Sequence, residues 1–322
     1  MDLIFWIAFL AAIGVFLALD LGVFNRDAHV IATREALGWT ALWVSLAIGF
    51  GIAVSVWQGS QVGIQWFTGY VVEYSLSVDN VFVFALVFAA FAVPRELQHR
   101  VLFWGVLGAL VMRLALILVG AHLIESYHWI IYVFGAFLLF TGVRMALVGG
   151  ETVSHPDKNP IVRFAARHVR LVPEFHGQRF LVRTAVGLAA TPLLLALIAV
   201  ETSDLIFAVD SIPAIFAITT DPFIVFTSNA FAILGLRSLY FLLAGAADRF
   251  RYLRLGLAAV LVFVGGKMLL TDILHLEPVV SLLVILTLLG ASVVGSLLAD
   301  RRDGRVAVTP PGAGDAAGQL PG

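Results

Sequence analysis

Residues 73–80 read Glu-Tyr-Ser-Leu-Ser-Val-Asp-Asn. Residues 201–211 read Glu-Thr-Ser-Asp-Leu-Ile-Phe-Ala-Val-Asp-Ser. Both stretches carry acids inside long apolar runs. No Lys or Arg adjoins either stretch. Glu73 and Asp79 are six residues apart, and so are Asp204 and Asp210. An ionisable group in hydrocarbon is costly and is usually functional. We interpret the two stretches as matching halves of one cation site inside a membrane.

The composition is that of a membrane protein. Apolar residues make up 61% of the 322 residues and charged residues 13%, with a mean hydropathy of +0.99. A soluble domain carries about 25% charged residues. The net charge of −1 predicts no nucleic-acid partner, and the lack of cysteine excludes disulfides, thiolate metal sites and cysteine catalysis. The first apolar run lacks a basic start, so we read it as a retained span and not as a signal peptide.

Apolar runs bounded by charges or turn residues predict an all-α, polytopic membrane protein with about nine transmembrane helices. About 20 residues cross the hydrocarbon core, so the third and sixth runs are expected to be bent, broken or strongly tilted. Pro192 and Pro213 predict kinks in the sixth run. The runs lie near 3–24, 37–57, 63–93, 101–121, 128–149, 185–220, 223–246, 255–271 and 279–299.

The Lys and Arg residues predict the orientation of these spans. With the N-terminus outside, the inside loops or span ends hold 17 of the 20 basic residues and the outside loops hold none. Under the positive-inside rule this asymmetry predicts a cytosolic C-terminus. The 17 are Arg26, Arg34, Arg95, Arg100, Arg144, Lys158, Arg163, Arg167, Arg170, Arg179, Arg183, Arg249, Arg251, Arg254, Arg301, Arg302 and Arg305.

The chain reads as one transmembrane domain over residues 1–300. The basic loop 150–184 is expected to be cytosolic, where it would orient the protein and face anionic lipid; a regulatory docking role is the alternative. The tail 301–322 is rich in Pro, Gly and Ala from Val306 onward and is expected to be disordered.

An internal repeat is predicted because three pairs of segments match in the same order. The acidic stretches form the first pair. Arg113 and Arg237 then each precede an apolar run ending in Gly, and residues 140–147 resemble residues 263–270. Residues 63–149 would thus correspond to 185–271. Each unit holds three spans, an odd number, so the second copy must be inverted, which is typical of transporters.

The five acids of the two stretches are the predicted metal ligands, and carboxylate oxygen suits Mn²⁺, Ca²⁺ or Mg²⁺. A local unwinding of the third span, and a break of the sixth before Pro213, would let them converge. Asp79 and Asp210 are expected to approach each other near the bilayer midplane. The ligands are Glu73, Asp79, Glu201, Asp204 and Asp210, supported by Asn80, Ser77, Ser211 and Asp20.

Three basic residues within spans, Arg113, Arg237 and Lys267, are expected to form ion pairs that lock helices together. Arg237 would pair with Asp204 or Asp210. The five acids and these three bases leave two negative charges, which one divalent cation would neutralise. Protonation of a buried carboxyl could replace the metal, so proton coupling stays open. No permanently bound cofactor is expected.

The strings at 73–80 and 201–214, together with Ala-Ile-Leu-Gly-Leu-Arg-Ser-Leu-Tyr at 232–240 and Ala-Leu-Asp-Leu-Gly-Val-Phe at 18–24, resemble the TerC family of integral membrane proteins. The resemblance covers about residues 1–300. It implies manganese export and metal homeostasis in the bacterial inner membrane, with the five acids as the site, and it carries the label of tellurium resistance. An acidic pocket should repel an oxyanion such as tellurite.

Two other functions remain open on the sequence. The first is an intramembrane aspartyl hydrolase that uses Asp79 and Asp210 as a dyad, although the chain has no Gly-x-Gly-Asp string. The second is a membrane scaffold in metal or tellurite stress that transports nothing. The additional acids and the repeat favour a secondary transporter that exports a divalent cation.

Overall fold

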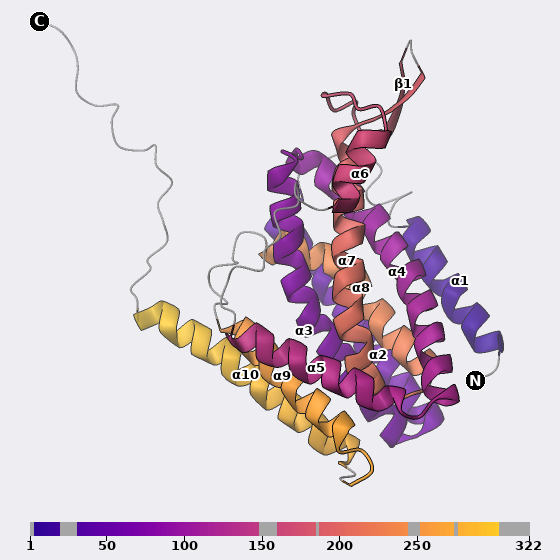
Figure 1. Cartoon of the computed structure of the whole chain (residues 1–322), viewed down its shortest axis with the longest axis vertical. Coiled ribbons are helices and arrows are strands. Elements are labelled where there is room, and N and C mark those ends of the chain that lie inside the picture. Colours follow the sequence, from indigo (N-terminus) through magenta and orange to yellow (C-terminus); the bar gives the residue numbers. More distant parts are fainter. Residues whose placement is uncertain are drawn as a thin grey trace, which may run out of the picture.

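The structure is a computed structural model that describes residues 3–19, 31–147, 160–184, 187–243, 252–273 and 276–302. Helices dominate it, and a short antiparallel hairpin of β1 (Leu181–Thr184) and β2 (Gly187–Ala190) is added between α6 and α7 (Figure 1). The helices are α1 (Leu3–Leu19), α2 (Thr33–Gln58), α3 (Ser60–Ala90), α4 (Arg95–Ser126), α5 (Ile130–Leu147), α6 (Pro160–His168), α7 (Pro192–Phe216), α8 (Pro222–Leu243), α9 (Leu253–Leu269) and α10 (Pro278–Arg302).

Seven helices in the described ranges are long and apolar enough to cross a membrane, namely α2, α3, α4, α5, α7, α8 and α10. The expected all-α, polytopic membrane architecture is therefore confirmed. Helices α1 and α9 have 17 residues each, which is at the lower limit of about 17–25 residues for a span. The count of nine spans stays a prediction.

The two runs that looked too long for one span differ from expectation. Helix α3 is unbroken from Ser60 to Ala90, so the predicted unwinding between Glu73 and Asp79 is wrong. At 31 residues it is about 46 Å long, which exceeds the hydrocarbon core of about 30 Å. An unbroken helix satisfies its own backbone groups, and its side chains reach their partners without unwinding.

The sixth run, predicted over residues 185–220, is long because it includes the second strand of the hairpin, β2 (Gly187–Ala190). Its helix, α7, begins only at Pro192, which takes the first helical turn and does not kink the helix. The helix also continues past Pro213 and ends at Phe216, so the predicted break before Pro213 is wrong as well. The earlier start at residue 185 is corrected to residue 192.

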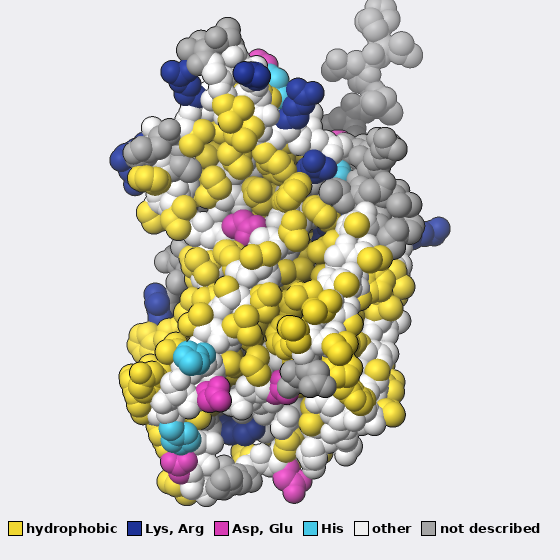
Figure 2. Space-filling model, turned by 90° about the vertical axis from the view of Figure 1, so that its right-hand side faces the viewer, with side chains coloured by type: hydrophobic (Ala, Val, Ile, Leu, Met, Phe, Trp, Pro, Cys, Tyr) yellow, Lys and Arg dark blue, Asp and Glu magenta, His cyan; other side chains and the backbone are white. Residues whose placement is uncertain are grey.

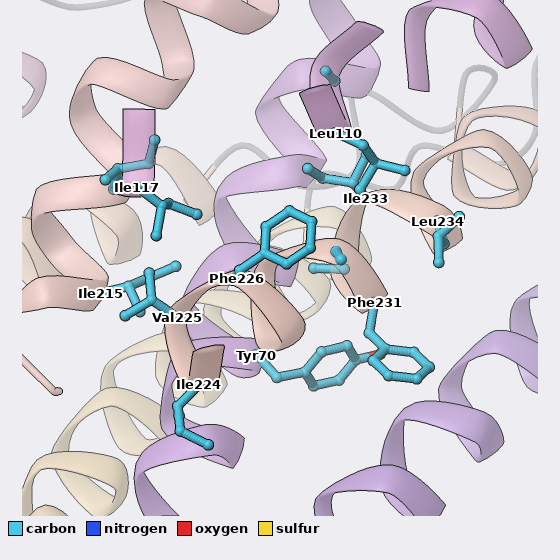
Figure 3. Packing of buried hydrophobic residues seen from close by; sticks show 14 of the residues in the cluster. Tyr70, Leu110, Ile117, Ile215, Ile224, Val225, Phe226, Phe231, Ile233 and Leu234 are labelled. Carbon is cyan, nitrogen blue, oxygen red and sulfur yellow. The ribbon is translucent and has the colours of Figure 1, made fainter. Parts of the chain in front are cut away.

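Helix α8 forms the centre of the bundle. Residues 223–240 are buried without interruption, because α2, α3 and α4 surround the helix. Figure 3 shows Tyr70 of α3, Leu110 and Ile117 of α4, and Ile215 of α7 around the side chains of α8, including Phe226 and Ile233. A helix enclosed on all sides has no lipid-facing surface, so its polar residues must find partners within the protein.

Helices packed against one another have the directions that the predicted repeat requires. Along α3 and α8, Trp66 donates to Thr227 at 3.0 Å and Gly69 contacts Ser228, so the two helices are parallel. Along α4 and α7, positions 105, 108 and 120 face positions 200, 201 and 216, which is again parallel. The predicted repeat matches α3 with α7 and α4 with α8, so it maps the pair α3–α8 onto the pair α7–α4. The repeat itself stays a prediction.

Helices α5 and α9 are the third helices of the two predicted repeat units, so the repeat matches them with each other. They pack antiparallel, since Gly135 faces Met268 while Gly142 faces Ala258 and Val262. Both helices lie obliquely beside α10 in Figure 1, across the end of the bundle opposite the hairpin. Close approach at small residues is a common way to pack helices in membranes.

The two ends of the molecule differ in charge. Figure 2 shows most of the visible basic side chains gathered toward the end that carries α6 and the hairpin, and most of the visible acids and histidines toward the other end, where a basic side chain also appears. Apolar side chains cover the surface between them. This is the asymmetry that the positive-inside rule uses, although the direction of insertion stays a prediction. Residues 148–159 of the basic loop and 303–322 of the tail lie outside the described residues.

Candidate functional site

Arg113 of α4 joins three helices through one buried guanidinium. Its Nε donates to Asp204 Oδ2 at 3.1 Å and its Nη2 donates to Asp204 Oδ1 at 2.9 Å. Its Nη1 donates to Glu73 of α3 and, at 3.2 Å, to the Ser211 hydroxyl of α7. We call these four residues the Arg113 cluster.

The Arg113 cluster is closed to solvent and lipid. The side chain of Arg113 is 0% exposed, that of Glu73 1% and that of Asp204 3%. The bidentate pairing of Arg113 with Asp204 is a specific, strong arrangement. Removing one member of a buried ion pair lowers the free energy of unfolding by roughly 3–5 kcal/mol. The expected ion pairs of Arg113 are therefore present, and they link α3 and α4 of the first predicted repeat unit to α7 of the second.

A row of unsatisfied oxygens runs along α3 from this cluster. Glu73, Ser77 and Asn80 are spaced at i, i+4 and i+7, which places them on one helical face. All three are buried, and within the described residues Glu73 Oε2, Ser77 Oγ and Asn80 Oδ1 have no hydrogen-bond partner. Each such atom costs about 1–3 kcal/mol, so the row calls for an explanation.

Asn229 of α8 shows the same pattern. Both its Oδ1 and its Nδ2 lack a partner among the described residues, and the side chain is fully buried. The sequence analysis did not single it out. The available signal was an amide in the apolar run Phe223–Leu236, where a polar group is expensive unless it has a use.

Glu201 lies one helical turn before Asp204 on α7 and is half-buried. Its carboxylate rests against the backbone of α4 at Gly108, where an added Cβ would collide with it. The glycine therefore creates the space that the acid occupies. Glu201 and Asp204 also repel each other electrostatically, as neighbours at i, i+3 on one face should.

Asp79 and Asp210 have surroundings different from those of the Arg113 cluster. Asp79 is half-buried and interacts electrostatically with Arg254 at the start of α9. Asp210, also half-buried, forms a hydrogen bond with Thr141 of α5. Their expected approach near the midplane stays a prediction. Asp20 lies outside the described residues.

The other two basic residues within predicted spans are the buried Arg237 and the half-buried Lys267. Arg237 is 7% exposed and lines a narrow cavity that Asp204 also lines. Both oxygens of Asp204 are engaged by Arg113, so a pairing of Arg237 with Asp204 stays a prediction. Lys267 donates to Ser281 of α10 at 3.0 Å, an interaction with a neutral partner.

The five predicted ligands thus divide among three environments. Glu73 and Asp204 share Arg113, Glu201 adjoins them, and Asp79 and Asp210 lie elsewhere along their helices. Within the described ranges, no three His, Asp or Glu side chains are arranged to hold a metal ion. Glu73 and Asp204 are not arranged around an ion because the guanidinium of Arg113 lies between their carboxylates. Their role as metal ligands stays a prediction.

The model of the integral membrane protein TerC family matches residues 58–304. The chain belongs to the TerC family. An uncharacterised membrane protein of Myxococcus xanthus is 54% identical over 296 residues, covering 92% of each chain.

A TerC-family relative from Escherichia coli K12 bears the name putative membrane-bound redox modulator Alx. It is 49% identical over 293 residues, covering 88% of this chain and 91% of its own. An uncharacterised membrane protein of Rickettsia felis is 36% identical over 293 residues, covering 91% and 97%. No solved structure matches the chain.

Proposed function

We propose that this TerC-family protein is a secondary transporter that exports a divalent cation, with Mn²⁺ as the cargo. The observation that carries the proposal is the row of unsatisfied oxygens on α3, which begins at Glu73 in the Arg113 cluster. Buried polar atoms without partners are accounted for if a ligand visits them.

The donor chemistry supports a hard cation. Carboxylate, hydroxyl and amide oxygens are the ligands that Mn²⁺, Mg²⁺ and Ca²⁺ accept, and the row offers one of each. The row leads from Glu73 past Ser77 to Asn80, beside Asp79. Proton exchange for the metal is compatible with the same acids, since a proton can neutralise a carboxylate that the cation has left.

A redox role by thiol chemistry is not open to this chain, because it contains no cysteine. The name of the Escherichia coli relative therefore points to no residue pair here.

The hydrolase alternative gains no support either. Asp79 interacts with Arg254 whereas Asp210 bonds to Thr141, so each acid has a different partner among the described residues.

The test is Mn²⁺ flux in proteoliposomes that contain the purified protein. Ser77→Ala removes an unsatisfied hydroxyl, so the rate should fall at least tenfold while thermal stability is kept or raised. Ser75→Ala is the matched control, because the Ser75 hydroxyl is satisfied by the Val71 carbonyl at 2.7 Å. Its rate should stay within twofold of wild type.

Asp79→Asn and Asp210→Asn extend the test to the two acids outside the Arg113 cluster. Each keeps the side-chain size and removes the charge, so each should abolish Mn²⁺ flux in a folded, inserted protein. Lack of any divalent flux in the wild-type protein would leave the non-transporting scaffold as the better reading. Wild-type flux in both Asn variants would mean that these acids are structural.

A further inference from the structure

Arg113 lies between two carboxylates that the proposed function assigns to the cargo. The guanidinium contacts both oxygens of Asp204 and one oxygen of Glu73, and leaves Glu73 Oε2 without a partner. A fixed cation at this point offsets one of these negative charges when no metal is bound. It also blocks the metal, since both positive groups need the same oxygens.

The local charges match one divalent cation. Glu73, Asp204 and the adjoining Glu201 carry three negative charges when ionised, and Arg113 carries one positive charge. The remainder is two negative charges, which a single divalent cation neutralises. A monovalent cation would leave one charge uncompensated in a low-dielectric interior, where this is expensive.

Glu201 offers the guanidinium a second carboxylate. It precedes Asp204 by three residues, about 4.5 Å along α7, on the same face. Its carboxylate already rests on α4, the helix that carries Arg113, in the space left by Gly108. An exchange of Asp204 for Glu201 would move the guanidinium of Arg113 by about one helical turn along α7.

We propose that Arg113 is a tethered counter-cation of the transport site. It offsets one charge of the Glu73 and Asp204 pair while the cargo is absent, and it yields Asp204 to the arriving divalent cation by turning to Glu201. This inference rests on the proposed function and adds the device that offsets part of the charge of the buried acids between transport cycles. It assigns Glu201 and Gly108 to the exchange step.

The first experiment measures Mn²⁺ binding to purified Arg113→Gln protein by the shift of melting temperature and by titration. Without its competitor, Mn²⁺ should bind at least tenfold more tightly than to wild type. The metal-free variant should melt at a lower temperature, and Mn²⁺ should restore most of the loss. Arg113→Lys, which keeps a cation, should lie between the two. A metal-free loss that Mn²⁺ does not restore would overturn the proposal.

The second experiment keeps Arg113 and blocks its alternative position. Gly108→Ala should displace the Glu201 carboxylate and weaken Mn²⁺ binding at least tenfold in a protein that stays folded. Gly105→Ala is the matched control on the same face of α4. Its added Cβ would meet a methyl group of Val200 at 3.0 Å and no acid, so Mn²⁺ binding should stay within twofold.

The outcomes separate this inference from the proposed function. A wild-type protein that neither binds nor transports any divalent cation contradicts both. A wild-type protein that transports Mn²⁺, with Gly108→Ala binding it as tightly as Gly105→Ala does, contradicts only the exchange between Asp204 and Glu201. Should Arg113→Gln fail to fold even with Mn²⁺ present, the comparison of the two glycine variants decides the question alone.

Discussion

At the scale of single residues, the guanidinium of Arg113 decides how two carboxylates are tolerated inside a membrane protein. A lone carboxylate there would be neutralised or expelled, because the interior does not solvate its charge. Glu73 and Asp204 instead share one arginine, and three helices converge on it. The oxygens without a partner among the described residues, on Glu73, Ser77 and Asn80 of α3, are then available to a ligand.

A double-mutant cycle on Arg113 and Asp204 tests this coupling. Arg113→Gln and Asp204→Asn should each destabilise the metal-free protein by roughly 3–5 kcal/mol, because each leaves a buried charge unpaired. The double variant should lose clearly less than the sum of the two losses. Unfolding in detergent, followed by circular dichroism, gives the free energies. Additive losses would show that the pair contributes no coupling energy.

At the scale of helices, glycines set which helices can touch. The contact of α5 with α9 depends on Gly265, where an added Cβ would lie 2.6 Å from the backbone nitrogen of Leu139. Gly135 and Gly142 play the same part from the side of α5. Backbone cannot move aside as a flexible side chain can, so the helices must separate if Gly265 gains a side chain.

Gly265→Ala should therefore lower the melting temperature of the purified protein by several degrees, through loss of packing between α5 and α9. Gly266→Ala is a close control, since an added Cβ at Gly266 meets nothing within 4 Å. Alanine favours helix over glycine by about 1 kcal/mol, so the control should melt at the wild-type temperature or above. Equal melting of the two variants would contradict the close contact.

At the scale of the whole molecule, the charge asymmetry of Figure 2 predicts how the protein sits in the membrane. The end with α6 and the hairpin carries the basic residues, so it should face the cytosol. The opposite end, where α4, α5 and α9 meet, carries acids and histidines. The parallel pairs α3 with α8 and α4 with α7 agree with this arrangement, because each pair spans in one direction on the predicted topology.

The lack of native cysteine makes this orientation testable with single-cysteine variants. Tyr127→Cys, in the exposed turn between α4 and α5, should react with a membrane-impermeant thiol reagent in intact cells. Glu174→Cys, in the exposed segment before the hairpin, should react only after the membrane is opened. The reverse pattern would place the N-terminus inside and invert the predicted topology.

Much of the architecture could be predicted from the sequence, because span length and apolarity are local properties of the chain. The acidic strings also stood out locally, since any charge within 20 apolar residues is conspicuous. The third run was expected to unwind between Glu73 and Asp79 but is one unbroken helix, whereas the pairing of Arg113 with acids was expected in kind. The start of the sixth run was wrong because the apolar strand β2 reads like the start of a span.

The tertiary structure alone decided which acids meet and which atoms stay unsatisfied. Glu73, Arg113 and Asp204 come from three helices, and Ser211 joins them from about two turns beyond Asp204 on α7. No local sequence pattern specifies that these residues meet. The same holds for Gly108, whose space for Glu201 exists only once α4 and α7 pack. The sequence by itself determined that this chain belongs in a membrane and carries buried acids. Packing determined that an arginine stands between two of them, because charge partners are chosen by distance in space.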